Sequence, residues 1–261
     1  MSTPPPCPSV FETIEVLDGH PFALAEHLSL LSSAAATLGL PDPDRKLIDS
    51  AVGETLRRWG PEPGRLRVSW SGRRDSSEGT LRGSLHLFIA PLIVPNRPAH
   101  VDVADTPVDT GSVLYGLKSS GMTPGVATIA SHPDADEVLL VNLGAHLVEG
   151  CSSNIFLVCD DSLITPPLSS GCRAGVTRSI ILEAVSSVGI SVREEAVEVS
   201  DLAEVAEAFL ASTGRNVQSI ASIAGRPLTV DGELTQATRI AFLAARARDL
   251  SRDVGAPHHQ L

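Results

Sequence analysis

The chain has 261 residues, of which 43% are hydrophobic and only 3% aromatic, and its formal net charge is −11. This length allows one large domain or two small ones with a sizeable core, and the composition excludes a chain that is disordered throughout. The sequence pI of about 5.1 argues against nucleic acid as a main partner, although a local arginine cluster could still bind an anionic substrate.

The start of the chain and its cysteines favour a cytoplasmic location. Residues 1–9 are rich in proline and lack the basic region and apolar core of a signal peptide. No apolar run approaches the about 20 residues that a membrane helix needs, so no membrane partner is expected. The cysteines Cys7, Cys151, Cys159 and Cys172 have no CxxC or Cys/His spacing, which favours free thiols over a disulfide framework or a metal site.

Residues 1–103 predict a small α+β domain. An alternating strand meets Asp18-Gly19, a dipeptide typical of a hairpin turn, and apolar residues then recur at helical spacing. The second helix ends before Gly60-Pro61. The expected elements are a strand over 11–16, helices over 24–38 and 43–59, and strands over 66–70 and 81–89.

Residues 104–116 are polar and punctuated by glycine and proline, which suits a connection between domains. The remainder, residues 117–261, predicts a larger domain in which short strands alternate with helices. Its expected helices cover 123–132, 175–188, 202–205 and 236–250. Its expected strands cover 137–142, 147–148, 155–158, 163–164, 192–197, 208–211 and 217–223, with a further contribution near Leu228.

Residues 148–178 combine a carboxylate, an apolar strand and a helix start. Glu149 follows an apolar pair and precedes a glycine, and Gly175–Arg178 begins a helix after a loop. A buried carboxylate can hold a protonated ring nitrogen, and the N–H groups of Val176 and Thr177 at a helix N-terminus can hold a phosphate. This combination would suit pyridoxal phosphate (PLP). Each feature alone also has an ordinary structural interpretation, as a solvated turn or a simple helix start.

Lys118 is the candidate for a Schiff base with such a cofactor and for the proton transfer that follows. The only other lysine, Lys46, lies in a polar helix start where we expect it to be solvated. Lys118 lies between an apolar pair and a small-residue turn, although an exposed lysine at a loop edge remains the alternative. Residues 212–214, Ser-Thr-Gly, form a second small-residue turn of the kind that precedes the helix at 175.

Several stretches, in order over nearly the whole chain, resemble the class IV (fold type IV) PLP-dependent family. This family includes branched-chain aminotransferases, D-amino-acid aminotransferases and 4-amino-4-deoxychorismate lyases. The matching stretches are Phe11-Glu12-Thr13, His27-Leu28, Leu117-Lys118, Asp136-Glu137, Glu149-Gly150, Ser153-Asn154-Ile155-Phe156, Thr165-Pro166 and Gly175-Val176-Thr177-Arg178.

The resemblance implies a particular fold, cofactor and assembly. The fold would be α+β, with a small N-terminal α+β domain and a larger C-terminal domain that has a β-barrel-like core. PLP would bind at the domain interface of a homodimer. Lys118 would be the catalytic Schiff-base lysine and Glu149 the partner of the pyridine nitrogen. The further cofactor-binding residues would be Ser153, Asn154, Val176, Thr177 and Thr213.

The chain departs from the family pattern at three places. Leu30 occupies the position of an arginine that usually holds the phosphate, and an arginine that binds phosphate through two hydrogen bonds is hard to replace. Met122 and Thr123 stand where a tyrosine commonly follows the lysine, whereas the only tyrosine, Tyr115, precedes it. The chain also starts almost at Phe-Glu-Thr, which indicates an abbreviated small domain or a start upstream of Met1.

The leading prediction is a lyase of folate biosynthesis that converts 4-amino-4-deoxychorismate to 4-aminobenzoate and pyruvate. The Phe-Glu-Thr stretch and the short chain favour it. An aminotransferase acting on branched-chain or D-amino acids and a non-catalytic PLP-fold paralogue remain alternatives, the second because of Leu30 and Met122. A substrate carboxylate would need an arginine, for which Arg67, Arg178 and Arg215 are candidates.

Overall fold

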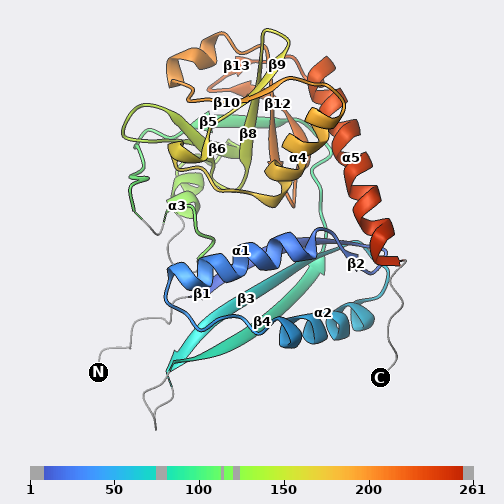
Figure 1. The fold of residues 1–261 in the computed structure, drawn as a ribbon. Helices are drawn as coiled ribbons and strands as arrows, with labels where there is room; N and C mark the ends of the chain where they lie inside the picture. The colour runs from blue at the N-terminus through green and yellow to red at the C-terminus, as the bar shows by residue number, and fades with distance from the viewer. Residues whose placement is uncertain (1–8, 75–80, 113–114, 120–123, 255–261) are drawn as a thin grey trace. The chain divides into compact units, whose positions relative to one another are not determined.

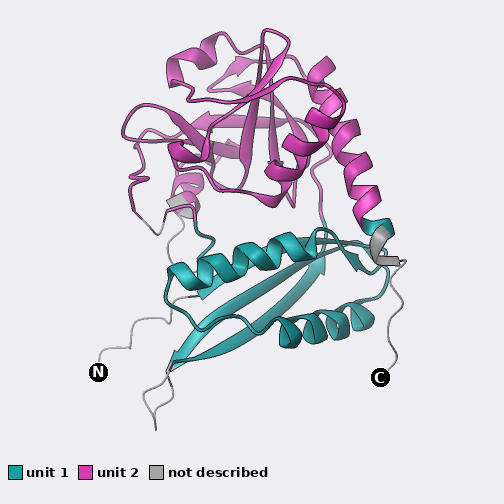
Figure 2. Cartoon of the chain, viewed as in Figure 1, with its two compact units in different colours: residues 1–92, 117–123, 250–261 teal, residues 93–116, 124–249 magenta. Residues whose placement is uncertain are grey.

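The computed structural model describes residues 9–74, 81–112, 115–119 and 124–254. The chain divides into two compact units, of which the first comprises residues 1–92, 117–123 and 250–261, and the second residues 93–116 and 124–249 (Figure 2). This division differs from the expected ranges 1–103, 104–116 and 117–261. The reason is strand pairing, because residues 99–103 join the sheet of the second unit, whereas Lys118 hydrogen-bonds to the first.

The first unit is built on an antiparallel sheet in the order β2-β1-β3-β4 (Figure 1). Asp18 and Gly19 both have positive φ, as a tight hairpin turn between β1 and β2 requires. Alternate residues of β1 face the core, including Val10, Ile14 and Val16. The strands are β1 (Ser9–Leu17), β2 (His20–Pro21), β3 (Gly64–Arg74) and β4 (Leu81–Pro91).

Two amphipathic helices, α1 (Leu24–Thr37) and α2 (Arg45–Trp59), pack their apolar residues on this sheet. Asp44 caps α2, since its side chain accepts a hydrogen bond from the Leu47 N–H at 3.1 Å. The buried cluster of the first unit consists of Val10, Ile14, Val16, Leu28, Leu31, Ala35, Leu40, Ile48, Val52, Leu56, Leu66, Val68 and Trp70. Both predicted helices are confirmed to within about two residues at each end, the usual uncertainty of such boundaries.

The second unit contains a mixed sheet in the order β10-β9-β8-β11-β12-β5-β6-β7, with β13 paired to β12. Its strands are β5 (Ala99–Val103), β6 (Glu137–Val141), β7 (Leu147–Gly150), β8 (Asn154–Cys159), β9 (Ser162–Thr165), β10 (Val192–Glu194), β11 (Glu207–Ser212), β12 (Asn216–Ile223) and β13 (Arg226–Pro227). Its helices are α3 (Pro124–Ala130), η1 (Leu168–Ser170), α4 (Val176–Ser187), η2 (Val199–Ala203) and α5 (Glu233–Val254), of which α5 belongs to this unit up to Asp249.

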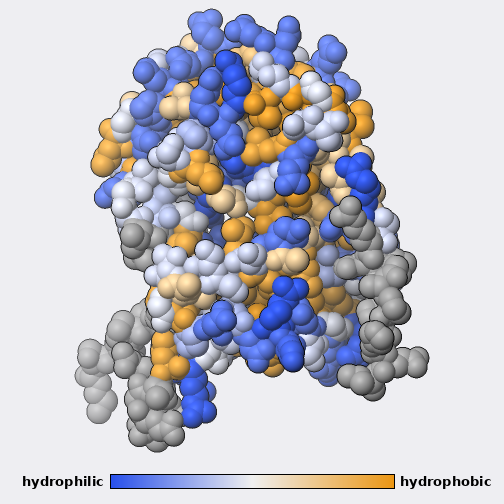
Figure 3. All heavy atoms as spheres, in the orientation of Figure 1, coloured by the Kyte–Doolittle hydropathy of each residue, from blue (hydrophilic) through white to orange (hydrophobic). Residues whose placement is uncertain are grey.

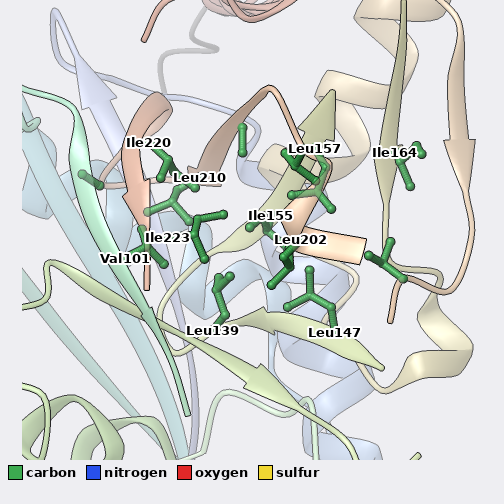
Figure 4. Close-up of a cluster of buried hydrophobic side chains, with 14 residues drawn as sticks. Val101, Leu139, Leu147, Ile155, Leu157, Ile164, Leu202, Leu210, Ile220 and Ile223 are labelled. Carbon is green, nitrogen blue, oxygen red and sulfur yellow. The ribbon is translucent and has the colours of Figure 1, made fainter. Parts of the chain in front are cut away.

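This sheet curls until its two edges approach each other. His146, immediately before β7, forms an isolated bridge with Glu198, which follows β10, and the Leu147 N–H donates to the Val197 carbonyl at 2.8 Å. Apolar residues from most strands fill the interior (Figure 4). On the other face of the sheet, Phe156 of β8 stacks on Phe209 of β11. The α+β fold class and its barrel-like core are therefore confirmed.

One strand was not predicted, and several predicted elements have other bounds in the structure. Residues 99–103 form β5, which was not predicted because His100 and Asp102 make the segment look polar. The strand expected over 192–197 ends at Glu194, since the chain then leaves β9 and reaches β7. The short helix expected over 202–205 begins and ends earlier, as η2.

Hydrophilic and apolar side chains are interspersed over the face of the second unit seen in Figure 3. Among the described residues, no helix is both long and apolar enough to cross a membrane.

Candidate active site

Lys118 is held against β1 of the first unit. The Phe11 N–H donates to the Lys118 carbonyl at 2.9 Å, and Val10 and Ser119 form an antiparallel bridge. The Lys118 amine lies 3.0 Å from Oε2 of Glu12, which is buried, and 27% of the lysine side chain remains exposed. Lys118 is therefore anchored through its backbone and its amine, and is unlike a lysine at a free loop edge.

Glu149 ends β7 in the second unit and its carboxylate is buried. Oε2 accepts hydrogen bonds from the Arg173 backbone N–H at 3.0 Å and from the Asn154 side-chain amide at 3.3 Å. Oε1 accepts from Nε of Arg173 at 3.0 Å. Because these donors include a guanidinium, the site can keep a negative charge on Glu149 away from water.

Arg173 was not predicted from the sequence. Its guanidinium pairs with Glu149 and also donates to the Cys151 carbonyl at 3.1 Å. Its backbone carbonyl accepts from the Asn154 amide at 3.0 Å, so that the carboxylate, the amide and the 173–175 turn form one network. Its position two residues before the Gly-Val-Thr helix start was visible in the sequence. Its partner Glu149, however, lies 24 residues earlier in the chain, so the ion pair could not be inferred.

The helix α4 begins beside this network. Its N-cap is Gly175, and no described side chain caps this end. The first hydrogen bond at this end of the helix is donated by the Ser179 N–H to the Gly175 carbonyl at 3.0 Å. The earlier N–H groups, including those of Val176 and Thr177, therefore have no acceptor within the helix. A Cβ at position 175 would lie 2.3 Å from Oδ1 of Asn154, so only glycine fits here.

Tyr115 leaves a polar atom unsatisfied in the same unit. Its buried hydroxyl has no hydrogen-bond partner among the described residues. Burial raises the pKa of the hydroxyl, and the nearby charge of Glu149 raises it further, so that the group stays protonated. A buried hydroxyl of this kind can donate to a ligand atom.

Glu137, from the matched stretch Asp136-Glu137, has a structural role in this unit, and the predicted residues Ser153 and Arg215 both contact it. Glu137 is fully buried, and its Oε2 accepts from the hydroxyls of Ser152 at 2.5 Å and Ser153 at 3.0 Å. Arg215 completes the cluster with a guanidinium nitrogen 3.3 Å from the same oxygen. The cluster fixes the turn that follows Glu149 and Gly150.

The three candidate substrate arginines lie in different surroundings. Arg178 is buried and pairs with Glu194 at 2.5 Å. Arg67 is exposed on β3, with its guanidinium 3.5 Å from the Phe11 ring centroid. Besides its contact with Glu137, Arg215 donates to Gln218 at 2.6 Å, and it lines a cavity of about 310 Å³ together with Arg97 and Arg239. Arg178 and Arg215 thus have separate ion-pair partners within the second unit, and Arg67 belongs to the first unit.

The remaining predicted positions are placed as follows. Thr213 is half-buried in the turn between β11 and β12. Leu30 is half-buried on α1, where it offers no phosphate ligand. Met122 and Thr123 lie outside the described residues, as does Cys7. Cys151, Cys159 and Cys172 carry free thiols. No cluster of three metal-ligating side chains occurs within the part of the chain that the structure describes.

The residues of the second unit fit a phosphorylated ring with a protonated nitrogen. Glu149 offers a buried anionic acceptor. The start of α4 offers backbone N–H groups that directly follow Gly175, where a larger residue would clash with Asn154. The unsatisfied Tyr115 hydroxyl adds a donor. PLP has the complementary groups: a phosphate, a pyridine nitrogen and a phenolic oxygen.

Comparisons with known proteins agree with this geometry. The family model "Amino-transferase class IV" matches residues 9–223. A probable branched-chain-amino-acid aminotransferase of Thermotoga maritima is 30% identical over 217 residues, which cover 80% of this chain and 75% of that protein. A bifunctional aminodeoxychorismate lyase / D-amino acid transaminase of Mycobacterium tuberculosis is 26% identical over 263 residues, covering 92% of this chain and 88% of that protein.

A solved structure shows the same fold. It is a hypothetical aminotransferase from Mycobacterium tuberculosis in a PLP-bound form, with a TM-score of 0.81 and 23% identity. The match covers 92% of this chain and 89% of that one.

Proposed function

Because the chain belongs to the class IV aminotransferases, we propose that it is the lyase that converts 4-amino-4-deoxychorismate to 4-aminobenzoate and pyruvate, a step of folate biosynthesis. The chain is an enzyme of this PLP-dependent class. The finer assignment is supported by the lyase activity named for the Mycobacterium tuberculosis relative and by the Phe11-Glu12-Thr13 stretch.

The observation that carries the PLP-dependent chemistry shared by both candidate reactions is the anchored amine of Lys118, 3.0 Å from the buried carboxylate of Glu12. Bound PLP supplies a ring that accepts the electrons left behind when a proton leaves the substrate carbon. Lys118 holds the cofactor between turnovers and, once released by the substrate amine, removes that proton with its Nζ.

The residues of the second unit hold the cofactor in this proposal. Glu149 would accept a hydrogen bond from the ring nitrogen and would favour its protonated form, which accepts electrons best. The N–H groups of Val176 and Thr177 would bind the phosphate, with Thr213 as a further ligand. Ser153 and Asn154 fix the turn and the carboxylate. Arg67, Arg178 and Arg215 stay candidates for the substrate carboxylate.

An aminotransferase acting on branched-chain or D-amino acids is the second candidate. The names of the Thermotoga maritima and Mycobacterium tuberculosis relatives support it. The two reactions begin with the same proton abstraction at Lys118 and differ in where the proton and electrons go next. Residues Lys118 and Glu149 serve both reactions equally, so only product analysis separates them.

The test starts with the colour of the protein. Purified protein supplied with PLP should show a visible absorbance band that borohydride reduction removes, as expected of a cofactor held by a lysine. Lys118→Ala should abolish the band, and the matched control Lys46→Ala, at an exposed position of α2, should retain it. A protein that stays colourless with PLP, or a band that survives in Lys118→Ala, would refute the lysine assignment.

Product analysis then distinguishes the reactions. Release of 4-aminobenzoate from 4-amino-4-deoxychorismate supports the lyase, and keto-acid formation from branched-chain or D-amino acids supports the aminotransferase. A coloured protein that forms neither product would contradict both and indicate a non-catalytic paralogue.

We further propose that the protein is a cytoplasmic homodimer. Large apolar side chains are exposed at Phe88 on the edge strand β4 (63%) and at Ile240 on α5 (69%), and contact with a second copy of the chain would cover them. Light scattering after size-exclusion chromatography should give twice the chain mass of 27.3 kDa. A mass equal to one chain would refute the dimer.

A further inference from the structure

Glu12 stands at a core-facing position of β1. The alternate residues Val10, Ile14 and Val16 on the same face are buried apolar residues, and the partner of Glu12 across the strand pair is Val68, also buried. An apolar side chain would therefore complete this layer. A carboxylate in such a layer loses its hydration, which is costly unless the charge is compensated.

His27 breaks the apolar pattern of α1 in the same way. It shares the buried face of the helix with Leu28, Leu31 and Ala35. Its Nδ1 lies 2.8 Å from Oε2 of Glu12. For this hydrogen bond the imidazole must carry a proton on Nδ1 and donate it to the carboxylate. The two polar residues that interrupt the apolar faces of β1 and α1 are therefore partners.

Lys118 binds the same oxygen as His27. Its Nζ is 3.0 Å from Oε2, and the three side chains become more exposed along the series His27, Glu12 and Lys118, at 4%, 7% and 27%. The backbone of residues 117–119 is itself hydrogen-bonded to β1 next to Glu12. The cluster therefore runs from the core of the first unit to one partly exposed amine.

The electrostatics keep Glu12 ionised. Burial is the largest influence on the pKa of its carboxyl and raises it, but the hydrogen bonds and charges of His27 and Lys118 together outweigh burial and hold the pKa below its usual value. A buried ion pair usually contributes no more stability than well-packed apolar residues of the same size. Stability alone therefore does not explain a glutamate and a histidine at these two positions.

We infer that Glu12 is a positioning residue, whose carboxylate, held in place by His27, keeps the amine of Lys118 at one point of the first unit. This inference rests on the proposed function, in which Lys118 is the reactive amine. Confinement by a buried counter-ion limits the directions from which Nζ can approach the cofactor and the substrate carbon, and such preorganisation raises the rate of the chemical step. His27 acts one contact further away, since it fixes the carboxylate and not the lysine.

The first test measures Lys118 without any cofactor. The wild-type protein is labelled at pH 8 with a limiting amount of acetic anhydride, and the modification of Lys118 is compared with that of exposed Lys46 by peptide mass spectrometry. In Glu12→Gln the amine of Lys118 is no longer held against a buried carboxylate and is freer to meet the reagent, so the rate ratio of Lys118 to Lys46 should rise by about two- to fivefold. His27→Asn should raise it less, and exposed Glu62→Gln should leave it unchanged. An unchanged ratio in Glu12→Gln would overturn the inference.

The second test separates positioning from folding. In Glu12→Met combined with His27→Leu, apolar residues fill the layer, so the midpoint of thermal unfolding should equal or exceed that of the wild type while the Lys118 labelling ratio still rises. A clear fall of the midpoint with a wild-type labelling ratio would assign the cluster to stability and overturn the inference.

The third test uses the PLP-loaded protein. Glu12→Gln should lower kcat by about 10- to 100-fold and change KM by no more than about twofold, because the misplaced amine affects the chemical step and not substrate binding. Glu12→Asp should recover part of the loss. A wild-type kcat in Glu12→Gln would overturn the positioning role. A wild-type protein that never takes up PLP would refute the proposed function alone, since the labelling ratio is measured without cofactor.

Discussion

Arg173 is the residue whose replacement probes the Glu149 network most directly. Arg173→Leu removes the guanidinium that lies 3.0 Å from Oε1 of Glu149 and 3.1 Å from the Cys151 carbonyl. Within the described part of the chain, two hydrogen bonds to Oε2 are retained, from the backbone N–H of residue 173 at 3.0 Å and from the Asn154 amide at 3.3 Å. The substitution therefore removes the positive charge and leaves part of the hydrogen bonding in place.

The size of the effect follows from burial. Removing one partner of a buried ion pair costs about 3–5 kcal/mol, because the other charge stays buried without compensation. Here the side chain of Glu149 is 3% exposed and that of Arg173 is 18% exposed, so solvent screens the pair slightly. With two donors retained, we expect the free energy of unfolding to fall by about 2–3 kcal/mol.

Urea unfolding of the cofactor-free protein measures this loss. The matched control is Arg45→Gln, which breaks an exposed pair with Asp49 on α2 and should cost only about 0.3–0.5 kcal/mol. Adding PLP should stabilise Arg173→Leu more than the wild type, because the ring nitrogen would supply the missing positive partner of Glu149. A loss as small as that of the control would refute the argument that Glu149 is a buried, compensated charge.

Three further predictions concern the second unit and the helices. Gly175→Ala would place a Cβ 2.3 Å from Oδ1 of Asn154, so it should lower both stability and PLP affinity in fluorescence titrations, whereas Gly53→Ala in the open face of α2 should stabilise by about 0.5–1 kcal/mol. Phe156→Ala removes a fully buried ring that stacks on Phe209, so the free energy of unfolding measured in urea should fall by about 3–5 kcal/mol. Burial raises the pKa of the Cys172 thiol from 9.0 to about 11, so the folded state keeps a proton that the unfolded state loses. Stability should therefore fall as pH rises from about 9 to about 11, and Cys172→Ala should make the fall shallower; an equal slope would contradict this.

The elements that the sequence predicted well are those with a short-range signal. The alternation in residues 11–16 and the Asp18-Gly19 turn correspond to β1 and its hairpin, and the helical spacing after Leu24 corresponds to α1. β5 was missed, because a short strand with His100 and Asp102 shows its buried face only when β6 and β12 pair with it on both sides.

The candidate site shows the same limit. Lys118 and Glu149 could be selected from scarcity, neighbouring residues and family motifs, and the structure anchors both. Arg173 could not be selected, since its role depends on a partner 24 residues away. Glu12 and His27 lie in stretches that match the family pattern, but the sequence assigned them no function. Only the structure shows that His27 and Lys118 both contact the carboxylate of Glu12.

The amino-acid sequence alone was sufficient for the family, the cofactor class, the fold class and most helices and strands, because apolar periodicity and compact motifs are encoded within a few neighbouring residues. The tertiary structure decided which unit each segment joins and which charges are paired. Those properties depend on strand pairing and on contacts between side chains far apart in the chain. A buried charge is stable only where folding brings its partner to it. Glu12 is therefore compensated by His27 and Lys118, and Glu149 by Arg173.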